Sequence, residues 1–251
     1  MYIACSSLCF SKYPFERALR TIDELQFQKV DLAIHERGAH LKPSEIAADV
    51  NRYAVMLRAT GMSFAAFHVE IEAADPETGK SHLRSVCRLG RLLTVPVVNI
   101  AAAPAGSDFE EEVKRLTHLH RLAEAEGVIL TVETHRETVT ADPMGAAELC
   151  RRVKGLGVTL DPSHYVAGPH ARQDYDDLFP FVRHVRLRDT SSDKLQVRIG
   201  QGQLEFGKII SLLNREDYDR ALTVDIHDLP DTGYPMEPEV RKLKYLLDSM
   251  I

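Results

Sequence analysis

The amino-acid sequence predicts an α/β protein folded as one (β/α)8 barrel, a single domain over residues 1–251. The length of 251 residues is typical of this fold, which usually takes about 250 residues. Short apolar segments alternate with longer amphipathic segments about eight times, with a period of roughly 31 residues, as expected of repeated βα units. Acidic residues, His and Arg follow several of the apolar segments, and a barrel places its active site at these strand ends.

Eight apolar segments are expected to form the strands. They cover residues 2–9, 29–35, 62–70, 97–102, 128–135, 158–161, 183–189 and 221–227. Their near-continuous apolar character is typical of parallel strands that are covered on both faces. A closed barrel fits better than an open doubly wound sheet, because no strand is followed by a glycine-rich nucleotide turn.

Amphipathic segments with helix start and stop signals connect these strands. The expected helices cover residues 14–25, 43–60, 77–93, 109–126, 206–213 and 238–250, with another beginning near residue 142 and a short one at residues 175–179. Pro14, Pro43 and Pro143 stand at helix starts, where the missing N–H of proline is tolerated. Gly61 and Gly127 stand at helix ends, where glycine is favoured.

The composition is that of a soluble globular protein, with 27% charged residues, 44% hydrophobic residues and a formal net charge of -6. A negative net charge argues against a nucleic-acid partner, which needs a basic surface. No cationic leader opens the sequence, and no apolar run approaches the roughly 18 residues that a membrane span requires. The four cysteines lack metal-binding spacing, so we expect reduced, buried thiols and a cytoplasmic location.

Titratable side chains gather at the expected strand ends. The set consists of His35, Glu36, His68, Glu70, Glu133, His135, Asp161, His164, Arg186, Asp189, Asp225 and His227. Each could be an ordinary loop residue, and Asp189 is better explained as a structural turn residue. Because the carboxyl ends of barrel strands meet at one mouth, their coincidence on the last four strands predicts an active site there.

Five motifs resemble the xylose isomerase-like barrel superfamily over essentially the whole chain. They are VETH (132–135), LDPSH (160–164), HVRLRD (184–189), GQGQLEFGKII (200–210) and TVDIHD (223–228). The superfamily includes sugar epimerases and isomerases, inosose dehydratases and the endonuclease IV group. The resemblance implies one divalent metal (Mn, Mg, Co or Zn) held by Glu133, Asp161, a strand-seven His and a strand-eight Glu. It also implies that His164 contacts the substrate.

Two positions depart from that pattern. Arg186 stands where the metal-ligating His is usual, and Asp225 stands where Glu is usual. A guanidinium offers no lone pair, so Arg186 cannot ligate a metal. We expect Arg186 to pair with Glu133, Asp161 or Asp225 and to replace the charge of the metal, which would be weakly bound or absent. Alternatively, Arg186 binds an anionic substrate while Glu133, Asp161, a nearby His and waters still hold a metal.

The resemblance implies an isomerase or epimerase that abstracts a proton next to the carbonyl of a small sugar, polyol or keto-acid. Glu133 and Asp225 are the expected catalytic acid/base pair, and Glu133, Asp161 and Asp225 are the expected ligands of any metal. The expected substrate-binding residues are His68, His135, His164, Arg186 and His227. Residues 198–203 and 230–235 are expected to form loops that set substrate specificity.

Three alternatives remain open. A dehydratase or lyase needs the same proton abstraction, and a non-catalytic member would bind a carbohydrate-like ligand through a decayed metal site. An abasic-site endonuclease is disfavoured, because that activity needs three zinc ions and this chain lacks a core His and carries a negative net charge. The sequence does not decide the oligomeric state, and a homo-oligomer is one of the open alternatives.

Overall fold

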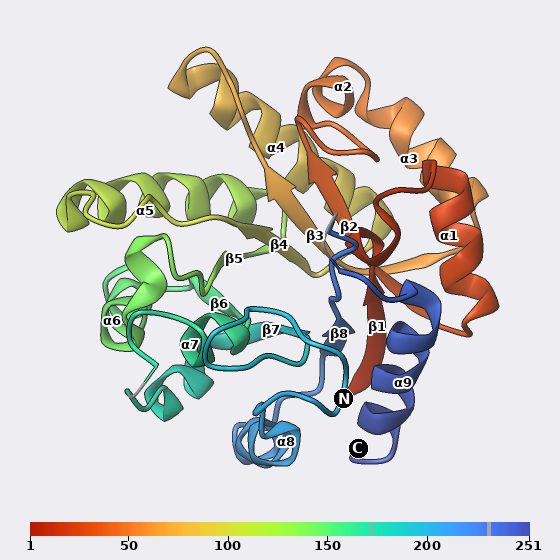
Figure 1. The fold of residues 1–251 in the computed structure, drawn as a ribbon. Helices are drawn as coiled ribbons and strands as arrows, with labels where there is room; N and C mark the ends of the chain where they lie inside the picture. The colour runs from red at the N-terminus through yellow and green to blue at the C-terminus, as the bar shows by residue number, and fades with distance from the viewer. Residues whose placement is uncertain (172, 230–231) are drawn as a thin grey trace.

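The computed structural model describes residues 1–171, 173–229 and 232–251. Eight parallel strands form a closed barrel in the order β1-β2-β3-β4-β5-β6-β7-β8, with the helices around it (Figure 1). The strands are β1 (Tyr2–Ser6), β2 (Lys29–His35), β3 (Ser63–Glu70), β4 (Val97–Ile100), β5 (Ile129–Glu133), β6 (Gly157–Leu160), β7 (Val182–Leu187) and β8 (Ala221–Val224). The chain therefore has the (β/α)8 fold that its sequence predicts.

Helices connect consecutive strands and cover the outside of the barrel. The α-helices are α1 (Phe15–Glu24), α2 (Pro43–Ala48), α3 (Val50–Ala59), α4 (Pro76–Leu93), α5 (Phe109–Ala125), α6 (Pro143–Arg152), α7 (Ser163–Val166), α8 (Phe206–Arg215) and α9 (Met236–Asp248). Three short 3-10 helices, η1 (Ser7–Phe10), η2 (Val139–Ala141) and η3 (Asp176–Phe181), complete the described elements. Burying the apolar faces of strands and helices against each other is the main stabilising term.

The barrel closes between its first and last strands. Tyr2 of β1 pairs with Ala221 of β8, and the pairing continues to Cys5 and Val224. This closure leaves no exposed sheet edge among the eight strands. It also fixes the carboxyl ends of β1 and β8 side by side, next to those of β7.

One expected strand is shortened and one expected helix is divided by a side chain that caps a helix. The strand expected at residues 2–9 ends at Ser6, because the Ser6 hydroxyl accepts the N–H of Leu8 and starts η1. The helix expected at residues 43–60 is divided into α2 and α3 at Asp49. The Asp49 backbone is non-helical (φ -156°, ψ 83°), and its carboxylate accepts the N–H of Arg52 as the cap of α3.

Strands β5 and β8 end earlier than expected, at Glu133 and Val224. His135, Asp225 and His227 therefore lie in the loops beyond the strand ends. Strand alternation does not decide which way these three side chains point. Their directions are set by loop contacts.

The cysteines agree with the expectation from their spacing. Cys5, Cys9, Cys87 and Cys150 are all free and buried. In the part of the chain that the structure describes, no helix has the length and apolar character needed to cross a membrane.

Candidate active site

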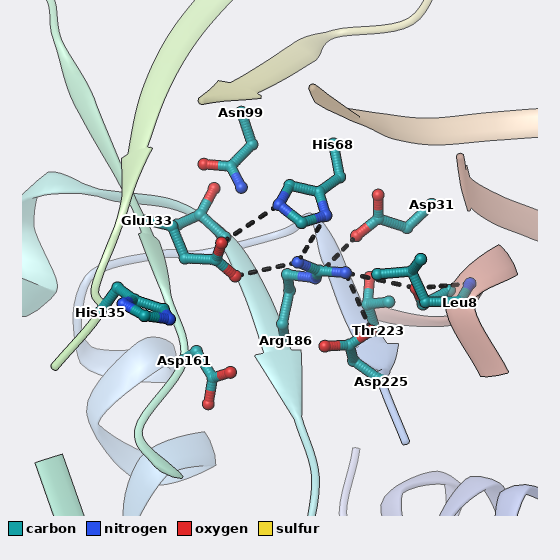
Figure 2. Close-up of polar contacts among 12 residues, drawn as sticks. Leu8, Asp31, His68, Asn99, Glu133, His135, Asp161, Arg186, Thr223 and Asp225 are labelled. Atoms are coloured by element: carbon teal, nitrogen blue, oxygen red, sulfur yellow. Dashed lines mark hydrogen bonds and ion pairs between the residues drawn. The ribbon is translucent and has the colours of Figure 1, made fainter. Parts of the chain in front are cut away.

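Arg186 lies at the centre of a polar cluster inside the mouth of the barrel (Figure 2). It projects from β7 and is 1% exposed. Its Nη1 donates to Glu133 Oε1 at 2.9 Å and to His68 Nδ1 at 2.9 Å. Its Nη2 donates to Asp225 Oδ1 at 2.9 Å and to Ser6 Oγ at 3.3 Å. Arg186 therefore forms the expected ion pair with two carboxylates, those of Glu133 and Asp225. Each of its four terminal N–H groups has an acceptor.

Arg188 is a second buried cation in the same cluster. Its Nη2 donates to Asp161 Oδ2 and, at 3.0 Å, to Asp225 Oδ2. No role was expected of Arg188 from the sequence. The signal that could have found it is its spacing of two residues from Arg186, because alternate residues of a strand share one face.

The three carboxylates have donors on all six oxygens. Arg186 and Arg188 bind one oxygen each of Glu133 and Asp161 and both oxygens of Asp225. The second oxygen of Glu133 lies 3.2 Å from His68 Nε2. The second oxygen of Asp161 accepts the N–H and the hydroxyl of Ser163, at 3.0 and 2.5 Å.

This arrangement does not fit the divalent metal that the family resemblance implies. A metal between Glu133, Asp161 and Asp225 would need the oxygen lone pairs that the two guanidinium groups now use. Two guanidinium charges already equal the charge of one divalent ion, and adding a metal a few ångströms away would cost several kcal/mol of repulsion. Of the two arrangements expected for Arg186, the structure has the paired one.

The network is held in its ionised form. Burial alone would raise the pKa of Glu133, but the attraction of Arg186 and His68 outweighs it and holds that pKa well below its usual value. Burial would likewise raise the pKa of Asp225, and Arg186, His227 and Arg188 together hold it well below its usual value. These carboxylates accept hydrogen bonds at neutral pH and do not donate them.

The other expected site residues lie around this cluster. His227 Nε2 lies 3.1 Å from Asp225 Oδ2, and His164 Nε2 lies 3.7 Å from Asp161 Oδ2. The ring of His135 packs on the ring of His164, with centroids 4.1 Å apart. Among the described residues, this ring contact is what joins His135 to the cluster. Burial lowers the pKa of His164 to about 4, although Asp161 opposes that shift.

Backbone N–H groups fix two of these imidazoles as hydrogen-bond donors. The N–H of Arg136 donates to His164 Nδ1 at 3.3 Å, and the N–H of Glu137 donates to His135 Nδ1 at 3.2 Å. In a neutral imidazole the other nitrogen then carries the proton. His164 and His135 are therefore Nε2–H donors.

The loop that follows β7 is held by Asp189, as its structural assignment predicts. Asp189 Oδ2 accepts the N–H groups of Gly200 and Gly202, and Asp189 Oδ1 accepts that of Thr190. The same loop carries Gln196, whose side-chain amide bonds both the N–H and the C=O of His227. Asp189 thus acts on the site by shaping the loop that positions His227.

The floor of the site contains residues that the sequence analysis missed. Asp31 Oδ2 lies 2.9 Å from His184 Nε2 and 3.4 Å from Arg186 Nε. Asn99 of β4 is also buried, and its amide faces the space between Glu133 and His68 in Figure 2. An acid or amide inside an otherwise apolar strand was the available signal for both residues.

The fold and this cluster together define a (β/α)8 barrel with a polar site at the carboxyl ends of its strands. The chain belongs to the xylose isomerase-like TIM barrel family, whose model matches residues 19–246. No curated protein matches the sequence.

Solved structures with the same fold cover nearly the whole chain. The probable 3-DHS dehydratase AsbF of Bacillus anthracis is 16% identical over 99% of both chains, with a TM-score of 0.75. D-allulose 3-epimerase of Methylomonas sp. is 15% identical over 100% of this chain and 98% of that one, with a TM-score of 0.76. A xylose isomerase-like TIM barrel protein of Mycobacterium smegmatis, in complex with magnesium, is 15% identical over 99% and 97%, with a TM-score of 0.76. At these identities the likeness establishes the fold alone.

Proposed function

We propose that this protein isomerises or epimerises a small sugar, polyol or keto-acid by abstracting a proton next to its carbonyl group. The observation that carries the proposal is the position of Glu133. Its ionised carboxylate contacts the two-arginine cluster through Arg186 and keeps 7% exposure, whereas Asp161 and Asp225 are 0% exposed. A base at a barrel mouth beside a fixed positive charge is the arrangement that enolisation requires.

In this mechanism the guanidinium groups stabilise the negative charge that develops on the substrate oxygen. All terminal N–H groups of Arg186 already have acceptors, so its contribution comes from its charge at close range in a buried site. The Nε2–H groups of His135 and His164 are suited to bind substrate oxygens. Glu133 accepts the proton and returns it to the carbon.

Epimerisation also needs an acid/base group on the opposite face of the reacting carbon. Asp225 is the expected partner of Glu133, but it is fully buried and covered by Arg186, Arg188 and His227. A role for Asp225 would therefore pass through His227, whose side chain is 28% exposed. Central metal chemistry has no part in this proposal, because the guanidinium groups use the lone pairs that a metal would need.

Two other functions are supported by single observations. A dehydratase would use the same base, and a probable dehydratase is among the proteins of similar fold. A non-catalytic carbohydrate-binding protein is favoured by the complete burial of Asp225. A small carbohydrate-like ligand is common to all three proposals. The cytoplasmic location and the lack of a nucleic-acid partner remain predictions.

The test is deuterium exchange from solvent into a panel of sugars, polyols and keto-acids, read by NMR and mass spectrometry. We expect exchange with wild type and none with Glu133→Gln, which removes the base and keeps the shape. Glu137→Gln is the matched control, because Glu137 lies in the same loop region with its side chain 73% exposed. Exchange that survives Glu133→Gln would show that another residue is the base. Tight binding without exchange would favour the non-catalytic function.

A further inference from the structure

A chain of imidazoles leads from Arg186 to the rim of the barrel at β2 and β3. Arg186 Nη1 lies 2.9 Å from His68 Nδ1, and His68 Nδ1 lies 3.2 Å from His35 Nε2. His35 Nδ1 in turn lies 3.4 Å from Glu70 Oε2. The Glu70 side chain is 57% exposed, so the chain ends at solvent.

The protons in this chain follow from Arg186. A guanidinium only donates, so His68 Nδ1 must be an acceptor and the His68 proton is on Nε2, facing Glu133. Since His68 Nδ1 offers only a lone pair, His35 must donate to it from Nε2. A neutral His35 then has its remaining lone pair on Nδ1.

This lone pair faces a carboxylate oxygen, and a carboxylate also only accepts. At 3.4 Å the contact is longer than the usual N–H···O distance of about 2.9 Å. A cation placed between these two acceptors would satisfy both of them.

We propose that His35 and Glu70 bind a zinc-type divalent cation at the rim of the barrel, apart from the arginine-filled carboxylate cluster. With both metal–ligand bonds at about 2.1 Å, a ligand separation of 3.4 Å gives an angle of about 108°, which suits tetrahedral zinc. His68 lies beside the two ligands, with one nitrogen or oxygen atom from each of His35, His68 and Glu70 within 4.8 Å of the others, and it orients His35 by accepting the Nε2–H. Water would complete the shell.

The outer end of the proposed site reaches solvent at Glu70, whose side chain is 57% exposed. Glu70 also lines a cavity of about 570 Å³ between the start of α4 and the middle of α5, next to the ends of β3 and β4. Metal binding uses the neutral imidazole of His35 and the ionised carboxylate of Glu70. Nitrogen and oxygen ligands together favour zinc over magnesium, which prefers oxygen alone.

The proposal is tested by isothermal titration of the untagged full-length chain with zinc chloride. We expect one zinc ion per chain, and at least tenfold weaker binding for Glu70→Gln. Glu72→Gln is the matched control, because Glu72 is also half exposed and pairs with Arg37. Cobalt titrated in place of zinc should give the visible absorption of a tetrahedral nitrogen-ligated ion in wild type and in Glu72→Gln only.

Three outcomes would overturn the proposal. Wild type binds no zinc, Glu70→Gln binds zinc as tightly as wild type, or zinc binding is lost in Glu133→Gln and kept in Glu70→Gln. The last outcome would place the ion at the central carboxylates. Because the titration needs no substrate, its result is independent of the proposed isomerase activity.

Discussion

Arg186 decides the character of the site at the scale of single residues. It is a fully buried cation, and its two nitrogens reach Glu133 and Asp225 from opposite ends of one planar group. Burial alone would lower the pKa of Arg186, but the attraction of Asp225 and Glu133 raises it above its usual value. A buried ion pair of this kind adds little net stability, yet removing one partner leaves uncompensated charges in the interior.

We therefore expect Arg186→His to lower the free energy of unfolding by about 3–5 kcal/mol, the usual result of breaking a buried ion pair. Mn²⁺ should restore part of this loss in the variant, because His supplies a lone pair where Arg supplied a charge. Mn²⁺ should leave wild type unchanged. Urea unfolding with and without Mn²⁺, in a Glu70→Gln background, measures both effects.

Arg37→His is the control for this experiment, since Arg37 is 84% exposed and its pair with Glu72 is expected to contribute about 0–1 kcal/mol. Asp161→Asn added to Arg186→His should abolish the rescue by Mn²⁺. If wild type already binds Mn²⁺ at full stoichiometry at the central carboxylates and Arg186→His does not tighten it, replacement of the metal by arginine is wrong.

At the scale of elements, the loop between β7 and α8 connects Asp189 to the candidate site. Asp189 accepts three backbone N–H groups of this loop, and Gln196 in the loop holds both backbone groups of His227. Gly202 packs against Asp189 so closely that an added Cβ would lie 2.0 Å from Asp189 Oδ1. The glycine is required by this contact.

Asp189→Asn should loosen the loop without touching the carboxylate cluster. An amide can keep only one acceptor oxygen, so at least one buried N–H loses its partner, at a cost of about 1–3 kcal/mol. Hydrogen exchange should become faster at residues 190–203 and at His227, and remain unchanged in β5 and β6. Asp193→Asn, an exposed change in the same loop, is the control. Unchanged exchange at His227 would contradict the link from Asp189 to the site.

At the scale of the whole molecule, barrel closure makes the site depend on every strand. The cluster draws Asp31 from β2, Glu133 from β5, Arg186 from β7 and Asp225 from the end of β8. Because β1 joins β8, these residues cannot separate without opening the sheet. We expect one cooperative unfolding unit over residues 1–251, as the single-domain prediction requires.

The pH dependence of unfolding tests this coupling. The pKa of His164 falls from 6.5 to about 4 in the folded state, so its stabilising contribution is complete above pH 6.5 and is lost between pH 6.5 and pH 4. The lowered pKa values of Glu133 and Asp225 extend the loss to lower pH. His164→Gln should reduce the slope of this dependence between pH 6.5 and pH 4 by up to about 1.4 kcal/mol per pH unit. The slope that remains there belongs to His35, whose pKa is lowered further, to about 2.

His118→Gln, a change at an exposed position of α5, should keep the wild-type dependence. Circular dichroism and tyrosine fluorescence should report the same transition at each pH, since the chain has 8 tyrosines and no tryptophan. Two separate transitions would show that the chain does not unfold as one domain. An equal slope in His164→Gln and wild type would show that His164 does not contribute to the dependence.

Local signals in the sequence were enough to predict the fold class and to place the candidate site at the strand ends. These signals are apolar periodicity, proline and glycine at helix ends, and the acids and His after each strand. The sequence also showed that position 186 carries a cation. A guanidinium cannot ligate a metal in any fold, so this conclusion did not need the structure. The ends of strands and helices were less well predicted. Ser6 ends a strand and Asp49 divides a helix, each through a side-chain bond to a nearby N–H group.

The tertiary structure decided which groups meet and which nitrogen of each imidazole carries a proton. Asp31 and His184 are 153 residues apart in the chain, and Arg186 and His68 are 118 residues apart. No local pattern encodes such pairings, because they depend on the barrel bringing distant strands together. The role of Arg188 and the contact between His35 and Glu70 arise in the same way, from side chains that share a buried space only after the barrel has closed.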